Sequence, residues 1–495
     1  MTDPQPSLAR RIASSIGWLA VAQVARRLSG LVVTAVLARL LPPEDFGLVA
    51  LASLATLLFG IITEFGLTSS LIQRKSVDDT DLSTGFWLGL VFGTVLAAVG
   101  YFAATPIAGI FSEPRIVPVL RVMLITLPIA ALGQVPGAIL QRNLDFRKVA
   151  HIDWSSGLLS GILGVAAAYA GFGLWALVIQ FVSATLLNVV LRQIVVRWRP
   201  IFVFSRRSAR AMLGFGSSMA GLALVNYAAV NVDNALIGAR IGTAALGYYM
   251  LAYNLILLPS TNIGGLVTRV MFPALSSLQS DRYRFAQAYA ATLRLVAVAT
   301  LPLVIGLGAT APVAIPAVYG PQWEPSIVIL AILTGVGAFQ AVNVSGVVYS
   351  AIGRPQLLLA WASFSVVVMA IAFIIGSRWG LNGVAWSYLI VSPIVFIPPH
   401  LIANHLIGLP QREFVRMIGV PLLSALIMGG AVVLARRAVD LSALPIAGQL
   451  LVLASFGAVV YVAALLGFAW GAGAGEAPIR WITRQQVAMA EERAK

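Results

Sequence analysis

The stretch LARLLPPEDFGLVALA at residues 37–52 has a counterpart 200 residues later, where residues 237–252 read IGARIGTAALGYYMLA. In this alignment Gly47 matches Gly247. Two further pairs follow in the same order: PRIVPVL at 114–120 with PSIVILA at 325–331, and GFGLWALV at 171–178 with GLNGVAWS at 380–387. Each match alone is weak in so apolar a chain, but their common order and offsets of 200 to 211 residues indicate an internal repeat.

The composition around these stretches is that of a membrane protein. The chain has 495 residues, of which 59% are hydrophobic and 10% charged, with a mean hydropathy of +0.91. A soluble protein carries about 25% charged residues, so most of this surface must face lipid. This excludes a soluble enzyme and a disordered scaffold. With no cysteine and three scattered histidines, disulfides and thiolate metal sites are excluded, and we expect no metal or cofactor.

Apolar runs long enough to cross a bilayer, about 20 residues each, predict an all-α polytopic protein with about 14 transmembrane helices. The expected spans are 15–40, 46–71, 82–104, 116–140, 150–170, 173–196, 211–239, 245–272, 285–310, 326–352, 356–377, 381–404, 414–435 and 446–470. Because six is even, two repeats of six helices share one orientation, as in parallel-repeat transporters. The expected parts are an N-terminal lobe (1–196), a basic linker (197–210), a C-terminal lobe (211–405), two further helices (406–470) and a tail (471–495).

Lysine and arginine predict the orientation of these helices. If the N-terminus is cytoplasmic, 22 of the 33 basic residues fall in inside segments and five in outside loops. Membrane proteins keep Lys and Arg in cytoplasmic loops, so both termini and the linker 197–210 are expected in the cytoplasm. The same rule accounts for the net charge of +15 without nucleic acid as a partner.

The sequence resembles a known family at several of these places. It is similar to the Wzx-type polysaccharide flippases, closest to the colanic-acid type, in the superfamily that also holds multidrug exporters and peptidoglycan lipid flippases. The stretches that carry the resemblance are ARLLPPEDFGLVALA (38–52), FGLTSSLIQRK (65–75), LQRNLDFRKVA (140–150), GLWALVIQ (173–180) and VDNALIGARIGTAALGYYMLAYNL (232–255). The resemblance implies a lipid-linked oligosaccharide substrate, a bacterial inner-membrane location and two lobes of helices.

Two adjacent arginines in the first span are the strongest site signal. Gln23, Arg26, Arg27 and Gly30 recur at helical spacing, and a charge at bilayer depth costs roughly 2.5–3.5 kcal/mol on insertion scales unless it faces a cavity or a partner. Two guanidiniums in a cavity suit a pyrophosphate. The alternative is a structural pair with a carboxylate such as Glu64 or Asp233.

The seventh span supplies the polar residues Asn226, Tyr227, Asn231, Asp233 and Asn234. Amides and a phenol suit sugar hydroxyls, although such groups also hydrogen-bond neighbouring helices together. Asp233, with Glu64 as second choice, is the candidate carboxylate for a coupling proton or sodium ion. Tyr253 is a candidate for stacking on a sugar.

Arg269 and Arg294, in spans eight and nine, lie within a few turns of the expected cytoplasmic face. Extension of the side chain to the interface accounts for both, while an incoming anionic headgroup would use the same charges.

Three functions fit these observations. The leading hypothesis is a flippase, not an enzyme, that moves an undecaprenyl-diphosphate-linked oligosaccharide by alternating access coupled to an ion gradient. Its partners would be that lipid, membrane lipids, a proton or sodium ion, and polysaccharide polymerase or other assembly proteins. The alternative is a cation-coupled multidrug exporter of the same superfamily. A membrane glycosyltransferase or polymerase is third, since the outside loops are short and carry only scattered acids.

Overall fold

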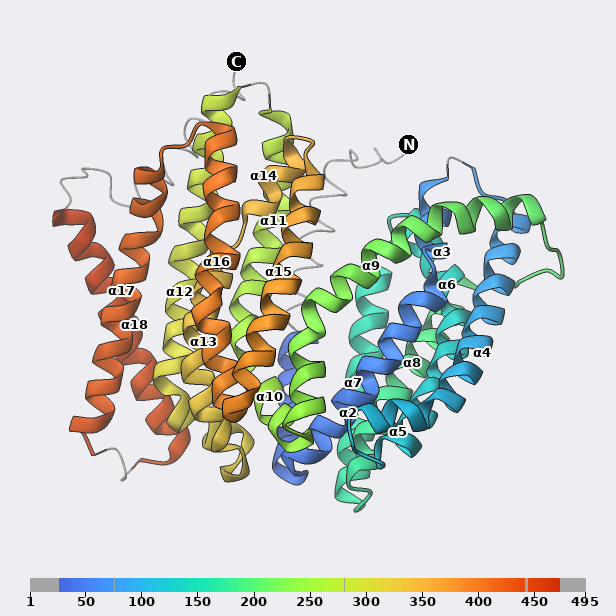
Figure 1. Cartoon of the computed structure of the whole chain (residues 1–495), viewed down its shortest axis with the longest axis horizontal. Helices are drawn as coiled ribbons and strands as arrows, with labels where there is room; N and C mark the ends of the chain where they lie inside the picture. The colour runs from blue at the N-terminus through green and yellow to red at the C-terminus, as the bar shows by residue number, and fades with distance from the viewer. Residues whose placement is uncertain (1–25, 75, 280, 441–443, 472–495) are drawn as a thin grey trace, which may run out of the picture. The chain divides into compact units, whose positions relative to one another are not determined.

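The protein is helical along almost all of the chain that the structure describes (Figure 1). A computed structural model describes residues 26–74, 76–279, 281–440 and 444–471, and no strand occurs in these ranges. The helices pack into two compact units, which meet at Met250 and Leu251 along the chain. We call residues 1–250 unit 1 and residues 251–495 unit 2.

Unit 1 begins, in the described part, with a helix over residues 26–40. The helices that follow are α2 (Pro43–Glu64), α3 (Leu67–Gln73), α4 (Asp79–Ile110), α5 (Ile116–Leu124), α6 (Thr126–Arg142), α7 (Phe146–Tyr169), α8 (Leu174–Val196), α9 (Arg206–Arg240) and the first half of α10 (Thr243–Pro259). Phe65 and Gly66 interrupt the second expected span, because both adopt a left-handed conformation between α2 and α3 (φ 38° and 64°).

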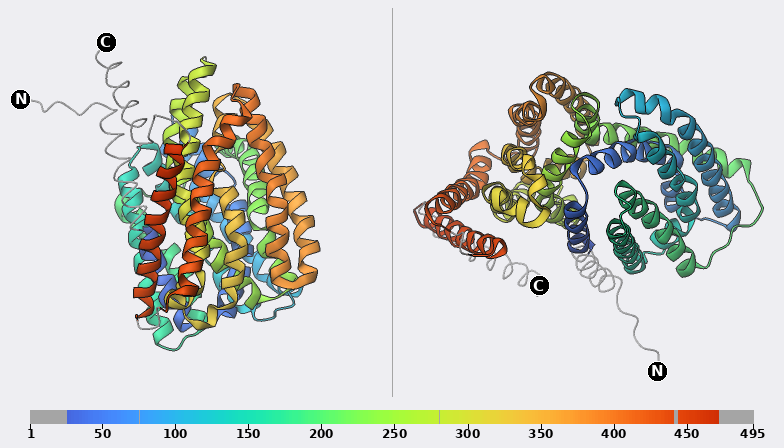
Figure 2. Two further views of the ribbon diagram at one scale, coloured as in Figure 1. Left: turned by 90° about the vertical axis from the view of Figure 1, so that its left-hand side faces the viewer. Right: turned by 90° about the horizontal axis from the view of Figure 1, so that it is seen from below.

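Unit 2 continues from the second half of α10. Its elements are η1 (Ser260–Gly264), α11 (Gly265–Ser277), α12 (Arg282–Tyr319), η2 (Pro321–Trp323), α13 (Pro325–Ala341), α14 (Ser345–Ala351), α15 (Pro355–Gly376), η3 (Ser377–Trp379), α16 (Gly380–Ile407), α17 (Gln411–Ala438) and α18 (Ile446–Gly471). The element η1 is a π-helical turn. Helices α17 and α18 run side by side at one edge of the unit (Figure 2).

Each expected span coincides with a helix or an interrupted helix, the first only from residue 26 onward. Ten described segments are long and apolar enough to cross a membrane, and one of them, Gln356–Ile407, contains both α15 and α16. A total of fourteen would also need α7, the run α10–η1–α11 and the helix over 26–40. The all-α membrane fold is therefore confirmed, and the count of fourteen stays a prediction.

Two glycines allow a close approach of two helices in unit 1. A Cβ atom on Gly47 of α2 would clash with the carbonyl oxygen of Thr243, and one on Gly247 of α10 would clash with that of Pro43. The start of each helix thus lies against the start of the other. These are the residues that the repeat pairs, so the sequence similarity marks a reciprocal packing contact.

The middle of the basic linker is bonded to α4. The backbone N–H groups of Ile201 and Ser205 donate to Ser83 Oγ (3.1 Å) and Thr84 Oγ1 (3.0 Å) of α4. Trp87 Nε1 donates to the Ile201 carbonyl (3.0 Å), and its ring stacks on Phe202. Packing thus places the linker and α9 in unit 1, whereas the repeat divides the chain at 197–210. The lobe boundary stays a prediction, since the repeat and the packing are different criteria.

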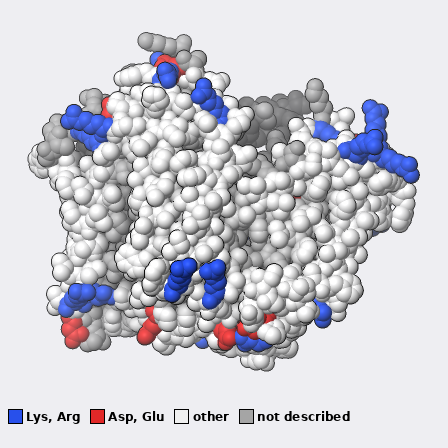
Figure 3. All heavy atoms as spheres, viewed as in Figure 1, with Lys and Arg blue, Asp and Glu red and all other residues white. Residues whose placement is uncertain are grey.

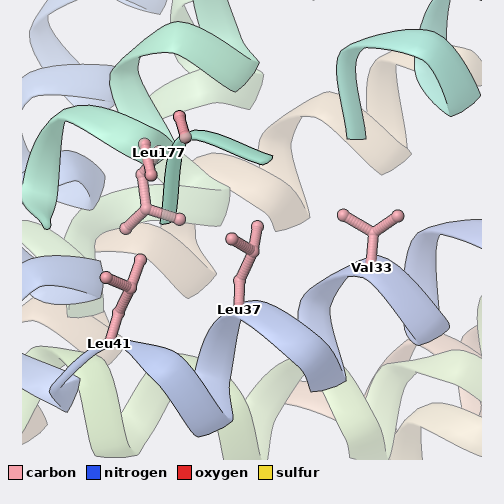
Figure 4. Close-up of a cluster of buried hydrophobic side chains, with 6 residues drawn as sticks. Val33, Leu37, Leu41 and Leu177 are labelled. Atoms are coloured by element: carbon pink, nitrogen blue, oxygen red, sulfur yellow. The ribbon is translucent and has the colours of Figure 1, made fainter. Parts of the chain in front are cut away.

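An apolar cluster joins the helix over 26–40 to the ends of α7 and α8. Val33, Leu37 and Leu41, spaced by four residues, project from one face of the chain, and Leu41 lies beside Leu177 (Figure 4). All four are at most 9% exposed.

Charged side chains lie mainly at the two ends of the helices. On the visible face of the molecule, Lys, Arg, Asp and Glu gather towards the helix ends, and the surface between them is largely uncharged (Figure 3). This pattern suits helices that cross a hydrocarbon layer.

One connection outside the spans holds an ion triad. Arg115 bonds Glu113 through Nε (2.8 Å) and also contacts Glu44 at the start of α2. The hydrogen bond from Arg115 holds the pKa of Glu113 below its usual range. The triad ties the α4–α5 connection to α2.

The topology can be tested on single cysteines, because the chain has none of its own. Phe202→Cys lies in the linker, where Phe202 is 92% exposed, and Ser112→Cys lies in the exposed α4–α5 connection. In cells with a permeabilised outer membrane, we expect an impermeant maleimide to label Ser112→Cys and to label Phe202→Cys only after the inner membrane is opened. The reverse pattern would contradict the orientation.

The glycine crossing can be tested on stability. Gly47→Ala should destabilise the protein by about 1–3 kcal/mol, because a methyl group must displace packed backbone. Gly109→Ala in α4 is the matched control, since a Cβ there meets nothing within 4 Å. The measurement is the apparent melting temperature by fluorescence-detected size exclusion in one detergent. Equal melting temperatures for the two variants would show that the crossing is not tight.

Candidate functional site

A polar pocket of about 380 Å³ lies inside unit 1 and is lined by the helix over 26–40 with α6, α7 and α8. We call it the Arg26 pocket. Its lining residues are Arg26, Ala130, Gly133, Asp153, Ser156, Gly157, Ala184, Thr185, Asn188, Val189 and Arg192. Ala130 lies 12 residues before the end of α6 and Arg192 four before the end of α8. At about 1.5 Å per residue, the pocket reaches about 18 Å in from the helix ends.

Helical spacing gathers the polar residues of the pocket. Thr185, Asn188 and Arg192 recur every three or four residues and so share one face of α8; Asp153 and Ser156 do the same on α7. The Asn188 amide donates to Asp153 Oδ1 (3.0 Å) and to Ser156 Oγ (3.3 Å). Arg192 Nη2 lies 3.8 Å from the same carboxylate oxygen, and its Nη1 donates to the Gly133 carbonyl (3.4 Å).

The charges of the pocket do not balance. Two guanidiniums line it, from Arg26 and Arg192, and one carboxylate, from Asp153, which pairs with Arg192. Within the described ranges no carboxylate lies within 4 Å of Arg26. The pocket therefore carries one uncompensated positive charge beside neutral donors, an arrangement that suits an anion with several oxygen acceptors.

Arg27 is placed differently from its neighbour. It does not line the Arg26 pocket, and its Nε is buried without a hydrogen-bond partner. In the described part of the chain it has no carboxylate within 4 Å, so the alternative pairing of these arginines with Glu64 or Asp233 is not formed. Gln23 lies outside the described residues. Of the residues expected to form a site in the first span, the structure places Arg26 in the lining of a pocket.

The polar residues of α9 form a mostly closed network. Asp233 is 4% exposed; one of its carboxylate oxygens accepts from the Tyr249 hydroxyl and the other from the Asn234 backbone N–H, both at 2.8 Å. The Asn234 side chain is 7% exposed, and its Oδ1 has no partner. Tyr227 donates to the Leu54 carbonyl of α2 (2.5 Å).

The other candidates on these helices are less enclosed. Asn231 donates to the Tyr227 carbonyl (3.0 Å), which is a contact within α9. Asn226 is exposed, and so is Glu64 at the end of α2. Asp233 is thus the more deeply buried of the two expected coupling carboxylates.

The remaining candidates lie in unit 2. Tyr253 lies with its hydroxyl 3.5 Å from that of Tyr388, which also accepts a hydrogen bond from Gln340 (2.9 Å). The two tyrosine rings are 6.2 Å apart, so Tyr253 belongs to a polar and aromatic cluster between helices. Arg294 is half-buried in α12. Arg269 is part of α11, and its side chain lies outside what the structure describes.

Three functional candidates were missed from the sequence: Asp153, Asn188 and Arg192. Arg192 falls within the sixth expected span, 173–196, but was counted only as a cytoplasmic charge; the structure places it on α8. Asp153 and Asn188 lie 35 residues apart on the two helices of one hairpin. Polar residues in two adjacent expected spans could have indicated this pair from the sequence. Among the described residues, no three His, Asp or Glu side chains gather into a metal-binding group.

An all-helical fold of membrane-spanning length, with a polar pocket inside one of its two units, defines a polytopic membrane protein of the transporter class. Comparison with known proteins narrows the class. The family model described as "Polysaccharide biosynthesis protein" matches residues 36–328. The chain belongs to this family, and the resemblance inferred from the sequence is confirmed.

Two named relatives agree with this assignment, and a solved structure has a similar fold. The chain is 29% identical over 431 residues to the teichuronic acid biosynthesis protein TuaB of Bacillus subtilis, covering 86% of this chain and 89% of the relative. It is 26% identical over 424 residues to the lipopolysaccharide biosynthesis protein WzxC of Escherichia coli, covering 84% and 85%. The lipid II flippase MurJ, in an inward closed conformation, shares the fold with a TM-score of 0.74 at 18% identity, over 92% of this chain and 99% of that one.

Proposed function

We propose that this protein is a flippase that moves an undecaprenyl-diphosphate-linked oligosaccharide repeat unit from the cytoplasmic to the periplasmic leaflet of a bacterial inner membrane. The product would serve the synthesis of an exopolysaccharide, a capsule or lipopolysaccharide. The observation that carries the proposal is the uncompensated charge of the Arg26 pocket in a family named for polysaccharide biosynthesis.

The physical task of such a flippase is to carry a charged headgroup with many hydroxyls through hydrocarbon. An anion loses its hydration there, at a cost that only a cationic, hydrogen-bonding cavity offsets. Arg26 offers a planar fork of donors that matches two phosphate oxygens at once. The Asn188 amide, the Ser156 hydroxyl and the Thr185 hydroxyl line the same pocket and suit phosphate or sugar oxygens.

The lipid tail of the substrate needs a separate, apolar surface. An apolar cavity of about 930 Å³ in unit 2 lies among α12, α13, α16 and α17. The only histidine in its lining, His400, has its two ring nitrogens at 2.8 and 3.0 Å from the carbonyls of Phe396 and Val342. A neutral imidazole can donate to one of these two carbonyls, so His400 adds no free donor to the cavity, which suits a segment of isoprenoid chain.

The alternative, an exporter of cationic drugs, fits this pocket poorly. A cationic substrate would meet the Arg26 and Arg192 guanidiniums, and the carboxylate of Asp153 already lies against Arg192 and Asn188. Like charges in a confined site repel, which disfavours such a substrate.

Alternating access driven by an ion gradient is part of the proposal. Asp233 is our first candidate for the group that takes up a proton or sodium ion. A buried carboxylate beside the unpartnered Oδ1 of Asn234 offers oxygen atoms to either ion. Glu64 is the second candidate, and Arg269 and Arg294 are candidates for guiding the anionic headgroup.

The substrate site predicts a graded response to substitution of Arg26. Arg26→Ala should abolish polymer export, because the pocket loses its uncompensated charge, and Arg26→Lys should impair export in part, since lysine keeps the charge but loses the fork. Export and protein abundance are measured together in a strain that lacks its own flippase.

Two controls separate the pocket from general charge loss. Arg207→Ala removes one exposed arginine from the start of α9 and should leave export unchanged. Arg27→Ala should cost less export than Arg26→Ala, because Arg27 does not line the pocket. Normal export by a well-expressed double variant of Arg26 and Arg27 to alanine would remove the pyrophosphate assignment.

The coupling assignment predicts that Asp233→Asn keeps normal abundance and loses the dependence of transport on an ion gradient. Asparagine keeps the shape of the side chain: its Oδ1 can accept from the Asn234 backbone N–H while its NH2 donates to the Tyr249 hydroxyl oxygen, so the packing is retained. Tyr249→Phe is the control: it leaves the carboxylate short of a donor, which costs about 1–3 kcal/mol, and should lower abundance while retaining gradient dependence. Full gradient-driven transport by Asp233→Asn would make Asp233 a structural residue.

A further inference from the structure

Unit 2 has a cationic pocket of its own, of about 360 Å³, at the end of the bundle where three connections meet. The start of α12, the turn between α14 and α15 and the end of α16 form its walls. The lining residues are Gln279, Arg282, Phe285, Ile352, Arg354, Leu406 and Ile407. We call it the Arg354 pocket.

The polar side chains of this pocket are those of two arginines, Arg282 and Arg354, and one amide, Gln279. Arg354 follows Gly353, whose positive φ of 73° turns the chain between α14 and α15. In the part of the chain that the structure describes, its guanidinium has no hydrogen-bond or ion-pair partner. Arg282 uses one N–H to bond the Leu406 carbonyl at the end of α16 (2.6 Å) and keeps the others. Two guanidinium groups therefore line the same pocket.

No carboxylate lines the Arg354 pocket to balance these charges. The nearest acid in sequence, Asp281, is engaged elsewhere: its Oδ1 accepts from the backbone N–H groups of Tyr283 and Arg284, and its Oδ2 lies 3.5 Å from Arg284 Nε. An anion that enters the pocket would meet two positive charges and no negative one.

The other half of the pocket is apolar. Phe285 and Ile407 are 2% and 3% exposed, and Ile352 and Leu406 complete this side. A free inorganic anion gains nothing from such a surface, whereas a phosphate esterified to a lipid would place its first apolar groups there. The volume lies within the range of small-ligand sites, roughly 300–1,000 Å³.

We propose that the Arg354 pocket binds the phosphate group of an anionic membrane lipid. The charge pattern of the sequence places this end of unit 2 on the cytoplasmic side, where anionic lipids give the leaflet a negative surface potential that attracts basic residues. The site does not involve the Arg26 pocket, and its occupation does not require that the protein transports anything.

The test measures binding to the full-length protein in a neutral detergent. The probes are dioctanoyl phosphatidic acid, dioctanoyl phosphatidylcholine and inorganic phosphate, each titrated in calorimetry or native mass spectrometry. We expect phosphatidic acid to bind more tightly than both other probes. Arg354→Gln should weaken its binding roughly tenfold or more, because a charge-assisted, bidentate contact is lost, and Arg354→Lys should weaken it less.

Arg378→Gln is the matched control, since Arg378 is also exposed in unit 2 but lies in η3, in another connection. It changes the net charge equally and should leave phosphatidic acid binding unchanged. Equal losses in both variants would reduce the effect to general charge. Equal affinity for inorganic phosphate and phosphatidic acid would overturn the lipid part of the proposal, and unchanged binding by a monodisperse Arg354→Gln variant would overturn the site itself.

Discussion

In hydrocarbon, a backbone amide has no partner except another backbone or side-chain group, and an unpaired one costs several kcal/mol. The chain meets this constraint by remaining helical through nearly all of its described length. At the start of three helices, a side chain caps free backbone N–H groups. Asp78, Ser205 and Asp281 each accept a hydrogen bond from the first turn of α4, α9 and α12. Hydroxyl groups within the helices bond the carbonyl one turn earlier, as those of Thr56, Thr300 and Thr310 do, whereas a charged or amide side chain there needs another partner or a ligand.

Two groups of polar residues in unit 1 answer this need in different ways. Asp233 has donors from Tyr249 and Asn234 within hydrogen-bond distance, so the protein itself satisfies most of its capacity. The Arg26 pocket instead shares one carboxylate between Asn188 and Arg192 and leaves the Arg26 guanidinium without a counter-charge. This difference is why we place ion exchange at the first group and an anionic substrate at the second.

The sequence predicted the helices well because hydropathy acts over about 20 residues, and local irregularities do not hide it. It also paired Gly47 with Gly247, which the structure places at a reciprocal contact. Smaller features depend on tertiary packing, and the sequence did not show them: the interruption at Phe65 and Gly66, and the ion pair between Arg192 and Asp153. The candidate site was predicted only in part. Arg26 could be recognised because it falls near the middle of the first expected span. Asp153 and Asn188 become a pair only when α7 and α8 pack together.

The attached linker has a mechanical consequence. A flexible linker would let α9 move while the preceding helices stayed still. Here, however, residues 201–205 are bonded to Ser83, Thr84 and Trp87 of α4. The start of α9 is therefore fixed to α4 and does not move independently of it. Any displacement of its far end must be accommodated by bending within its 35 residues, for which Gly214 and Gly221, both without neighbours at the Cβ position, leave room. The linker thus holds the first turn of α9 against α4, and any bend in this helix would have to fall beyond that turn.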